Sequence, residues 1–141
     1  MSKLDQIGIK IVEQPENAPP PADAVAVLHE IVTLLQELLA NDEGGVIDLQ
    51  ELALIPTDYE LLREALPEGE VSVRIDSIGP TEVRETIYPG VWWLTQYNVE
   101  GDMVVDMLEI TLLPEILQSH PDDVKDGLLR LQEVLTGPAH P

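Results

Sequence analysis

The chain of 141 residues contains no cysteine, and this absence excludes several kinds of chemistry at once. Without thiols there is no disulfide, no thiolate metal site and no cysteine nucleophile. The sequence also lacks a glycine-rich phosphate-binding loop, an H-E-x-x-H zinc motif and a G-x-S-x-G nucleophile motif. We therefore expect no catalytic residues, no bound cofactor and no tightly bound metal.

Basic residues are scarce, because 7 lysines and arginines face 27 acidic residues and leave a formal net charge of −20. A charge of this sign repels nucleic acid phosphates and anionic membrane surfaces, so we expect neither as a partner. The excess of acid serves solubility alone, or it forms a docking face for a basic partner; composition leaves both interpretations open.

Long hydrophobic runs are also missing. No segment approaches the roughly 20 apolar residues that a membrane span requires, and the first residues lack the apolar run of a signal peptide. We expect a cytoplasmic protein without membrane insertion. Phenylalanine is absent while 44% of the residues are hydrophobic, which predicts an aliphatic core in one compact domain.

The order of periodic segments predicts the fold class. Prolines in PENAPPP favour an extended arm over residues 1–21, and a single domain is expected over residues 22–141. Apolar spacing predicts helices over residues 23–40, 58–66 and from Pro121 to the Gly137–Pro138 stop, with strands over 46–49, 71–75, 82–87, 91–98 and 103–112. The order αβαββββα is typical of an α+β fold with helices packed on a mostly antiparallel sheet. The residues expected to face that sheet are Leu28, Ile31, Leu35, Leu38, Leu61, Leu128 and Leu131.

A hairpin centred on Pro89-Gly90 carries the most specific local pattern. Proline followed by glycine suits a type II turn, and two alternating runs meet there. Trp92 and Trp93 follow the turn, and adjacent strand residues face opposite sides. One tryptophan should therefore be exposed, or be covered by something else. We expect Trp92 to be the more buried, because it shares a face with Leu94.

Charged groups near the hairpin raise the question of catalysis. Asp76, Glu82, Glu85 and Glu109 could converge at one end of the sheet, and two close carboxylates suffice for general acid and base catalysis. A small carboxylate-based hydrolase or isomerase is therefore the alternative function, although coincidence is the simpler explanation among 27 acids. Arg84 is expected to pair with a neighbouring carboxylate.

His120 precedes a cluster of aspartates at the start of the last predicted helix. Asp122, Asp123 and Asp126 could be drawn with it as a metal site. Acidic residues at a helix N-terminus are sufficiently explained by the helix dipole, so we expect no metal there.

Eight short segments occur in an order that resembles a known family. They are LHEI (residues 28–31), VIDL (46–49), GEV (69–71), GPTEVRET (79–86), PGVWW (89–93), LEIT (108–111), PEIL (114–117) and HPDD (120–123). Together they resemble the C-terminal conserved region of the HupH/HyaF hydrogenase expression/formation proteins. The resemblance implies a bacterial, cytoplasmic, non-enzymatic accessory factor for maturation of a nickel-iron uptake hydrogenase. Its implied partners are the immature iron–sulfur small subunit or other maturation factors.

An exposed aromatic residue is a common anchor of protein interfaces, and surface charge mainly governs encounter rate. We therefore place the partner-binding surface at the hairpin and its neighbouring charged groups. The candidate residues are Arg84, Glu85, Pro89, Gly90, Trp92, Trp93, Tyr97 and Glu109. The oligomeric state stays open at this stage.

Overall fold

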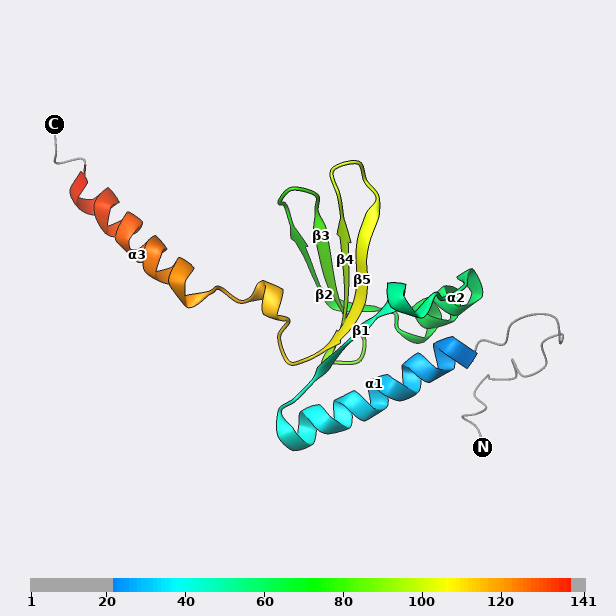
Figure 1. Ribbon diagram of the computed structural model, residues 1–141. Coiled ribbons are helices and arrows are strands. Elements are labelled where there is room, and N and C mark those ends of the chain that lie inside the picture. Colours follow the sequence, from blue (N-terminus) through cyan, green and yellow to red (C-terminus); the bar gives the residue numbers. More distant parts are fainter. Residues whose placement is uncertain (1–21, 138–141) are drawn as a thin grey trace.

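Three α-helices and a five-stranded antiparallel sheet make up residues 22–137, the part of the chain that this computed structural model describes (Figure 1). The expected arm over residues 1–21 lies outside the described residues. The elements are α1 (Ala22–Asn41), β1 (Gly45–Asp48), the 3-10 turn η2 (Leu49–Leu52), α2 (Pro56–Ala65), β2 (Glu68–Ile75), β3 (Thr81–Thr86), β4 (Val91–Tyr97), β5 (Met103–Ile110), the 3-10 turn η3 (Glu115–Leu117) and α3 (Pro121–Thr136). The predicted α+β class and element order are confirmed.

Strands β2 to β5 follow one another as a meander, and β1 joins the sheet beside β5, which gives the order β1-β5-β4-β3-β2. All pairs are antiparallel. The register places Arg84 opposite Trp93, and Trp93 opposite Leu108. It also places Glu85 opposite Trp92, and Trp92 opposite Glu109. Because side chains alternate along a strand, these two rows lie on opposite faces of the sheet.

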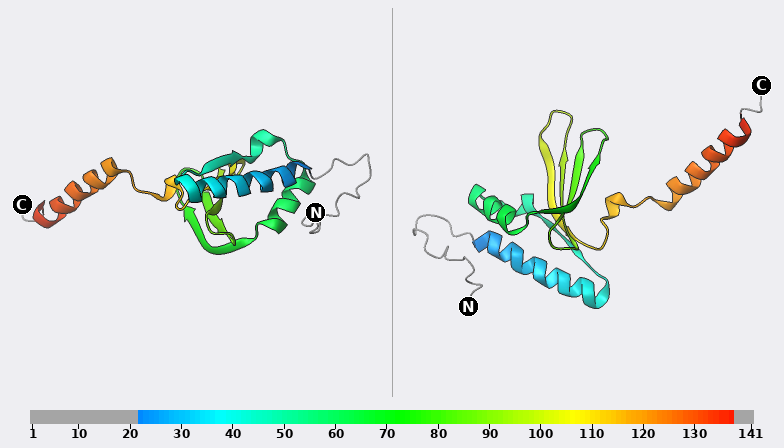
Figure 2. Two further views of the ribbon diagram at one scale, coloured as in Figure 1. Left: turned by 90° about the horizontal axis from the view of Figure 1, so that it is seen from below. Right: turned by 180° about the vertical axis from the view of Figure 1, so that it is seen from behind.

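The face with Trp93, here called the helix face, is covered by α1 and α2 (Figures 1 and 2). Buried α1 side chains recur at helical spacing, so that one stripe of the helix meets the sheet. The buried residues of this cluster are Ala24, Val27, Ile31, Leu38, Ile47, Leu49, Leu62, Leu66, Val91, Trp93, Leu108 and Ile110. Leu28, Leu35 and Leu61 pack against it, as predicted.

The face with Trp92, here called the far face, carries a smaller apolar cluster. Its buried members are Val83, Trp92 and Leu94. Leu117 of η3 packs against them, because the chain that leaves β5 returns over this face. The sheet therefore has an apolar layer on each side.

Helix α2 begins at Pro56, two residues before the predicted start at residue 58. Pro56 occupies the first turn and Ile55 is the N-cap. The carboxylate of Asp58 accepts hydrogen bonds from the backbone amides of Ile55 at 3.3 Å and of Ala24 at 3.4 Å. Asp58 is buried, and it joins the first turn of α2 to the first turn of α1.

The predicted packing of Leu128 and Leu131 on the sheet is wrong. Leu128 is 53% exposed and Leu131 is 62% exposed. Helix α3 extends away from the sheet in all three views (Figures 1 and 2). Proline disfavours the helical conformation in the residue before it, and His120 is extended. Helix α3 therefore starts in a new direction.

No helix within residues 22–137 is both long enough and apolar enough to cross a bilayer.

Candidate partner-binding site around Arg84

The predicted type II turn is present between β3 and β4. The amide of Val91 donates to the carbonyl of Tyr88 at 3.0 Å, and Gly90 has the positive φ, +93°, that this turn requires at its third residue. The amide of Gly90 donates to the Glu85 carboxylate at 3.3 Å. Glu85 therefore stabilises the turn from within, while Pro89 is exposed at its tip.

Both tryptophans are buried, each with 5% exposure. The expectation of an exposed tryptophan is wrong, as is the expectation that Trp92 is the more buried. The alternative holds, namely that the second ring is covered by something else, here another part of the same chain. Trp92 lies under η3, and its Nε1 donates to the carbonyl of Thr111 at 3.1 Å. The anchor assumed for the partner surface is thus absent from the folded protein.

A buried carboxylate, Asp106, positions the other indole. It accepts hydrogen bonds from Trp93 Nε1 at 2.8 Å and from Thr95 Oγ1 at 3.1 Å, and it is 4% exposed. Burial, followed by the negative charge of Asp106, raises the pKa of Tyr59. Sequence reasoning did not select Asp106, although it is the one acidic residue on an alternating face that is otherwise apolar.

Arg84 lies over the Trp93 ring, with its guanidinium carbon 5.8 Å from the ring centroid. Its Nη1 atom is 3.4 Å from Glu68 Oε2, which confirms the expected carboxylate partner. The Nε atom of Arg84 is buried and has no hydrogen-bond partner among the described residues. This donor is closed off from solvent, so a further acceptor group would have to reach the exposed part of the Arg84 side chain, which is 28% exposed.

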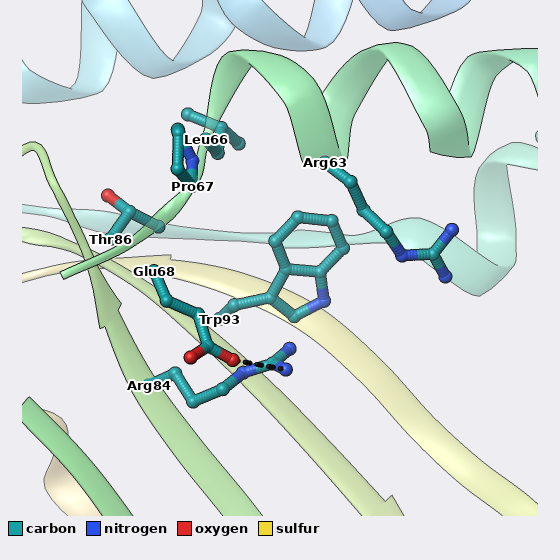
Figure 3. A pocket seen from close by; sticks show the side chains of 7 residues that line it. All are labelled: Arg63, Leu66, Pro67, Glu68, Arg84, Thr86 and Trp93. Atoms are coloured by element: carbon teal, nitrogen blue, oxygen red, sulfur yellow. Dashed lines mark hydrogen bonds and ion pairs between the residues drawn. The ribbon is translucent and has the colours of Figure 1, made fainter.

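A pocket opens beside Arg84, between α2 and the sheet (Figure 3). Its volume is about 160 Å³, and its lining residues are Arg63, Leu66, Pro67, Glu68, Arg84, Thr86 and Trp93. Two of the seven basic residues of this acidic chain thus line one small cavity. A guanidinium against an aromatic face binds carboxylate and carbonyl oxygens through directed hydrogen bonds. We call this cavity the Arg84 pocket.

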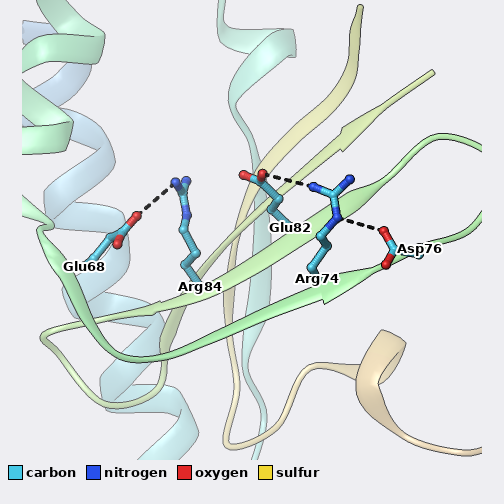
Figure 4. A network of polar contacts seen from close by, with 5 residues as sticks. All are labelled: Glu68, Arg74, Asp76, Glu82 and Arg84. Carbon is cyan, nitrogen blue, oxygen red and sulfur yellow. Dashed lines mark hydrogen bonds and ion pairs between the residues drawn. The ribbon is translucent and has the colours of Figure 1, made fainter. Parts of the chain in front are cut away.

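The four acidic residues considered for catalysis do not converge. Asp76 and Glu82 both contact Arg74, at 2.7 Å from Nε and 3.9 Å from Nη1 respectively (Figure 4). Glu85 and Glu109 lie on the far face, where the register places Trp92 between them. The set is therefore divided between two faces of the sheet.

Glu109 has a raised pKa. Burial raises its pKa, and the charge of Glu115 raises it further, whereas a hydrogen bond from the Glu115 backbone lowers it.

His120 acts as the N-cap of α3, since its Nδ1 accepts the amide of Asp122 at 3.1 Å. No group of three or more potential metal ligands occurs in residues 22–137.

The structure thus separates the candidate residues. Arg84 and Trp93 meet on the helix face, and Tyr97 lies opposite Met103 at the end of β4 away from the turn. The remaining candidates, on the far face or in the turn, are Glu85, Pro89, Gly90, Trp92 and Glu109.

Comparison with known proteins gives consistent matches. The family described as "HupH hydrogenase expression protein, C-terminal conserved region" matches residues 22–137. The hydrogenase expression/formation protein HupH of Rhodobacter capsulatus is 31% identical over 120 residues, which cover 83% of this chain and 44% of that protein. HupQ of Azotobacter chroococcum mcd 1 is 32% identical over 119 residues, covering 81% and 42%.

A solved structure also matches. The hydrogenase expression protein HupH from Thiobacillus denitrificans ATCC 25259 is 36% identical, with a TM-score of 0.78 over 82% of this chain and 96% of that chain. The present chain spans less than half the length of the curated relatives named above. From the family match over residues 22–137 and the shared fold, the chain belongs to the family of the HupH C-terminal conserved region.

Proposed function

We propose that this protein is an accessory factor in the maturation of a nickel-iron uptake hydrogenase, and that it binds the immature iron–sulfur small subunit. The observation that carries the proposal is the family membership over residues 22–137, together with relatives named hydrogenase expression/formation proteins. The protein would act in the cytoplasm, before the hydrogenase is exported.

Binding, rather than catalysis, agrees with the distribution of charged groups. Asp76 and Glu82 are paired with Arg74, and Trp92 lies between Glu85 and Glu109. A hydrolase or isomerase of the kind considered above would need two carboxyl groups at one site. The Arg84 pocket instead offers hydrogen-bond donors beside an aromatic ring, which suits an acceptor group on a partner surface.

The overall charge suggests how the partner is attracted. With −20 formal charges, the protein attracts a basic segment such as the twin-arginine signal of an exported small subunit. Charges mainly affect the association rate, whereas buried contacts affect the dissociation rate. Association should therefore slow as salt rises through about 0.15 M, where the screening length is near 8 Å.

Surface plasmon resonance with the purified precursor of the small subunit tests this function. Arg84→Gln should speed dissociation by the equivalent of about 2 kcal/mol, the usual threshold of an interface hot spot. Arg74→Gln is the matched control, because Arg74 also lies in the sheet and pairs with acids but does not line the pocket. Circular dichroism verifies that both variants are folded.

The outcomes separate the parts of the proposal. No binding of the precursor at micromolar concentration removes the small subunit as partner. Capture of another maturation factor instead would retain the maturation role and change the partner. Equal kinetics for the two arginine variants would exclude the Arg84 pocket as the contact site.

A further inference from the structure

Helix α3 presents an apolar stripe that no other part of the described chain, residues 22–137, buries. Val124, Leu128, Leu131 and Leu135 recur at spacings of four, three and four residues, and each is more than half exposed. None of the α3 residues, all of which the structure describes, is buried. Isolated helices of about 15 residues are marginal in water, so an amphipathic helix of this length is stabilised mainly by a surface that covers its stripe.

The far face of the sheet offers a surface of matching chemistry. A hollow of about 390 Å³ lies there, and its lining residues are Val46, Leu94, Gln96, Val105, Met107, Glu109, Glu115 and Ile116. It is mainly apolar, and two glutamates lie at one part of its lining. Part of this face is covered by η3, whose Leu117 packs against the far-face cluster.

The dimensions of the helix and the face agree. The 16 residues of α3 span about 24 Å at about 1.5 Å per residue. Strands β4 and β5, with seven and eight residues, span roughly 23 to 26 Å at about 3.3 Å per residue. The stripe itself, from Val124 to Leu135, spans about 17 Å at about 1.5 Å per residue and can therefore cover roughly two thirds of the length of the far face.

One basic residue beside the stripe complements the acidic part of the hollow, although α3 as a whole carries four acidic residues against two basic ones. Glu109 and Glu115 lie at the hollow, and the ion pairs found within residues 22–137 involve neither of them. Burial raises the pKa of Glu109, as expected for a carboxylate that would gain from a nearby cation. At 100° per residue, Lys125 lies beside the apolar stripe of α3, whereas Arg130 lies nearer to the polar side of the helix.

The connection to α3 directs the helix away from its own sheet. Gln118 and His120 are both extended, and Pro121 disfavours a helical conformation at His120. The Gln118 side-chain amide donates to the carbonyl of Leu113 at 3.0 Å, which fastens this connection to the chain after β5. Figures 1 and 2 show α3 leaving the body of the protein in all three views. A second copy is therefore the favoured occupant of the hollow.

We propose that two copies of this chain form a dimer by reciprocal exchange of α3, with the Val124–Leu135 stripe of each copy covering the far face of the other. Such an exchange is isologous, so each contact occurs twice and the assembly is closed. The helix face, with the Arg84 pocket, stays free in this arrangement. The dimer is independent of the proposed hydrogenase role.

Disulfide trapping tests the exchange directly, because the chain has no cysteine of its own. Leu131→Cys and Met107→Cys chains, mixed and oxidised, should give a cross-linked heterodimer on a non-reducing gel. Glu133→Cys is the matched control for Leu131→Cys, since residue 133 lies on the opposite side of α3, and it should cross-link far less with Met107→Cys.

The doubly substituted chain, Leu131→Cys with Met107→Cys, distinguishes exchange from folding back. A cross-linked dimer or larger species supports exchange, whereas an internally cross-linked monomer would overturn it by placing α3 on its own sheet. Sedimentation equilibrium of the unmodified protein provides the second measurement. A monomer at high micromolar concentration would also overturn the proposal.

Leu131→Asp should weaken the dimer at least about tenfold, because it places a carboxylate in the apolar stripe. The variant should stay folded, since Leu131 is exposed within its own chain. Glu133→Ala, on the polar side of α3, should leave the dimer dissociation constant unchanged. Equal effects of the two substitutions would contradict the stripe as the contact surface.

Discussion

Trp92 and Trp93 are neighbours in the chain, but their side chains are buried in separate clusters on opposite faces of the sheet. Each indole N–H has an acceptor, the carboxylate of Asp106 for Trp93 and the carbonyl of Thr111 for Trp92. The pair therefore connects β4 to the helices on one side and to the returning C-terminal segment on the other.

Fluorescence quenching should show two shielded tryptophans. We expect Trp92→Phe and Trp93→Phe each to leave one indole that acrylamide quenches weakly, because both rings are 5% exposed. Free tryptophan and the urea-unfolded variants are the reference states. Strong quenching of either folded variant would show that its remaining ring is open to solvent.

Two adjacent leucines of α1 should differ widely in their effect on stability. Leu38 is 8% exposed and belongs to the helix-face cluster, whereas Leu39 is 88% exposed. Leu38→Ala should lower the free energy of unfolding by about 2–5 kcal/mol, the usual range for a buried leucine. Leu39→Ala should change it by less than about 0.5 kcal/mol. Urea denaturation checks both, and similar midpoints would mean that the helix is rotated about its axis.

Alanine substitutions at two turn glycines should distinguish the cost of backbone strain from the cost of a steric clash. Gly79 and Gly101 have φ values of +77° and +92°, so alanine at either is strained by roughly 1–2 kcal/mol. A Cβ atom at Gly79 would lie 2.1 Å from the Tyr97 carbonyl oxygen, while one at Gly101 would meet nothing within 4 Å. Gly79→Ala should therefore lower the melting temperature clearly more than Gly101→Ala. Equal losses would contradict the close approach.

The partly buried carboxyl of Glu109 should make stability depend on pH. Its pKa is raised from the usual 4.5, mainly by burial, so the folded protein binds this proton more tightly than the unfolded chain does. The resulting stabilisation is present below pH 4.5 and is lost as pH rises through the folded pKa. Relative to the parent chain, Glu109→Gln should therefore be more favourable at pH 7 than at pH 4.

Urea denaturation at the two pH values measures this difference. Glu100→Gln, in the exposed turn between β4 and β5, is the control. Both variants are best compared in the Leu131→Asp background, so that self-association does not contribute. A pH-independent effect of Glu109→Gln would show that this carboxyl is well solvated.

The parts of the fold that depend on local chemistry were predictable from the sequence. Alternation along β4 and the Pro89-Gly90 pair indicated the hairpin, because strand periodicity and a positive φ at glycine are properties of a few adjacent residues. The same holds for α1, whose apolar stripe has helical spacing.

What could not be predicted depends on which surface covers which. The periodicity of α3 shows that Leu128 and Leu131 share one side, but it does not say what that side contacts. Alternation placed Trp92 and Trp93 on opposite faces, yet the cover over Trp92 comes from η3, beyond the next strand. A local sequence pattern does not indicate which distant segment will pack on a given surface.

The candidate site was also predictable only in part. Arg84 was selected by its position near the hairpin, but its contact with Trp93 depends on the register of β3 against β4. The pocket also needs Arg63 and Glu68, which come from α2 and β2. Asp106 had one local signal, a lone acid on an apolar face, and that signal is recognisable in comparable sequences.

The position of β1 affects how the chain folds during its synthesis on the ribosome. Each strand of the β2–β5 meander pairs with the next, whereas Gly45 of β1 pairs with Ile110 of β5. Contacts between distant residues form late, because a long loop must close first. Ribosomes add ~5–20 residues per second, so α1 and β1 wait roughly 3–13 s for β5. During that interval the α1 side chains that later pack on β4 and β5 lack this cover, which leaves apolar surface open to aggregation.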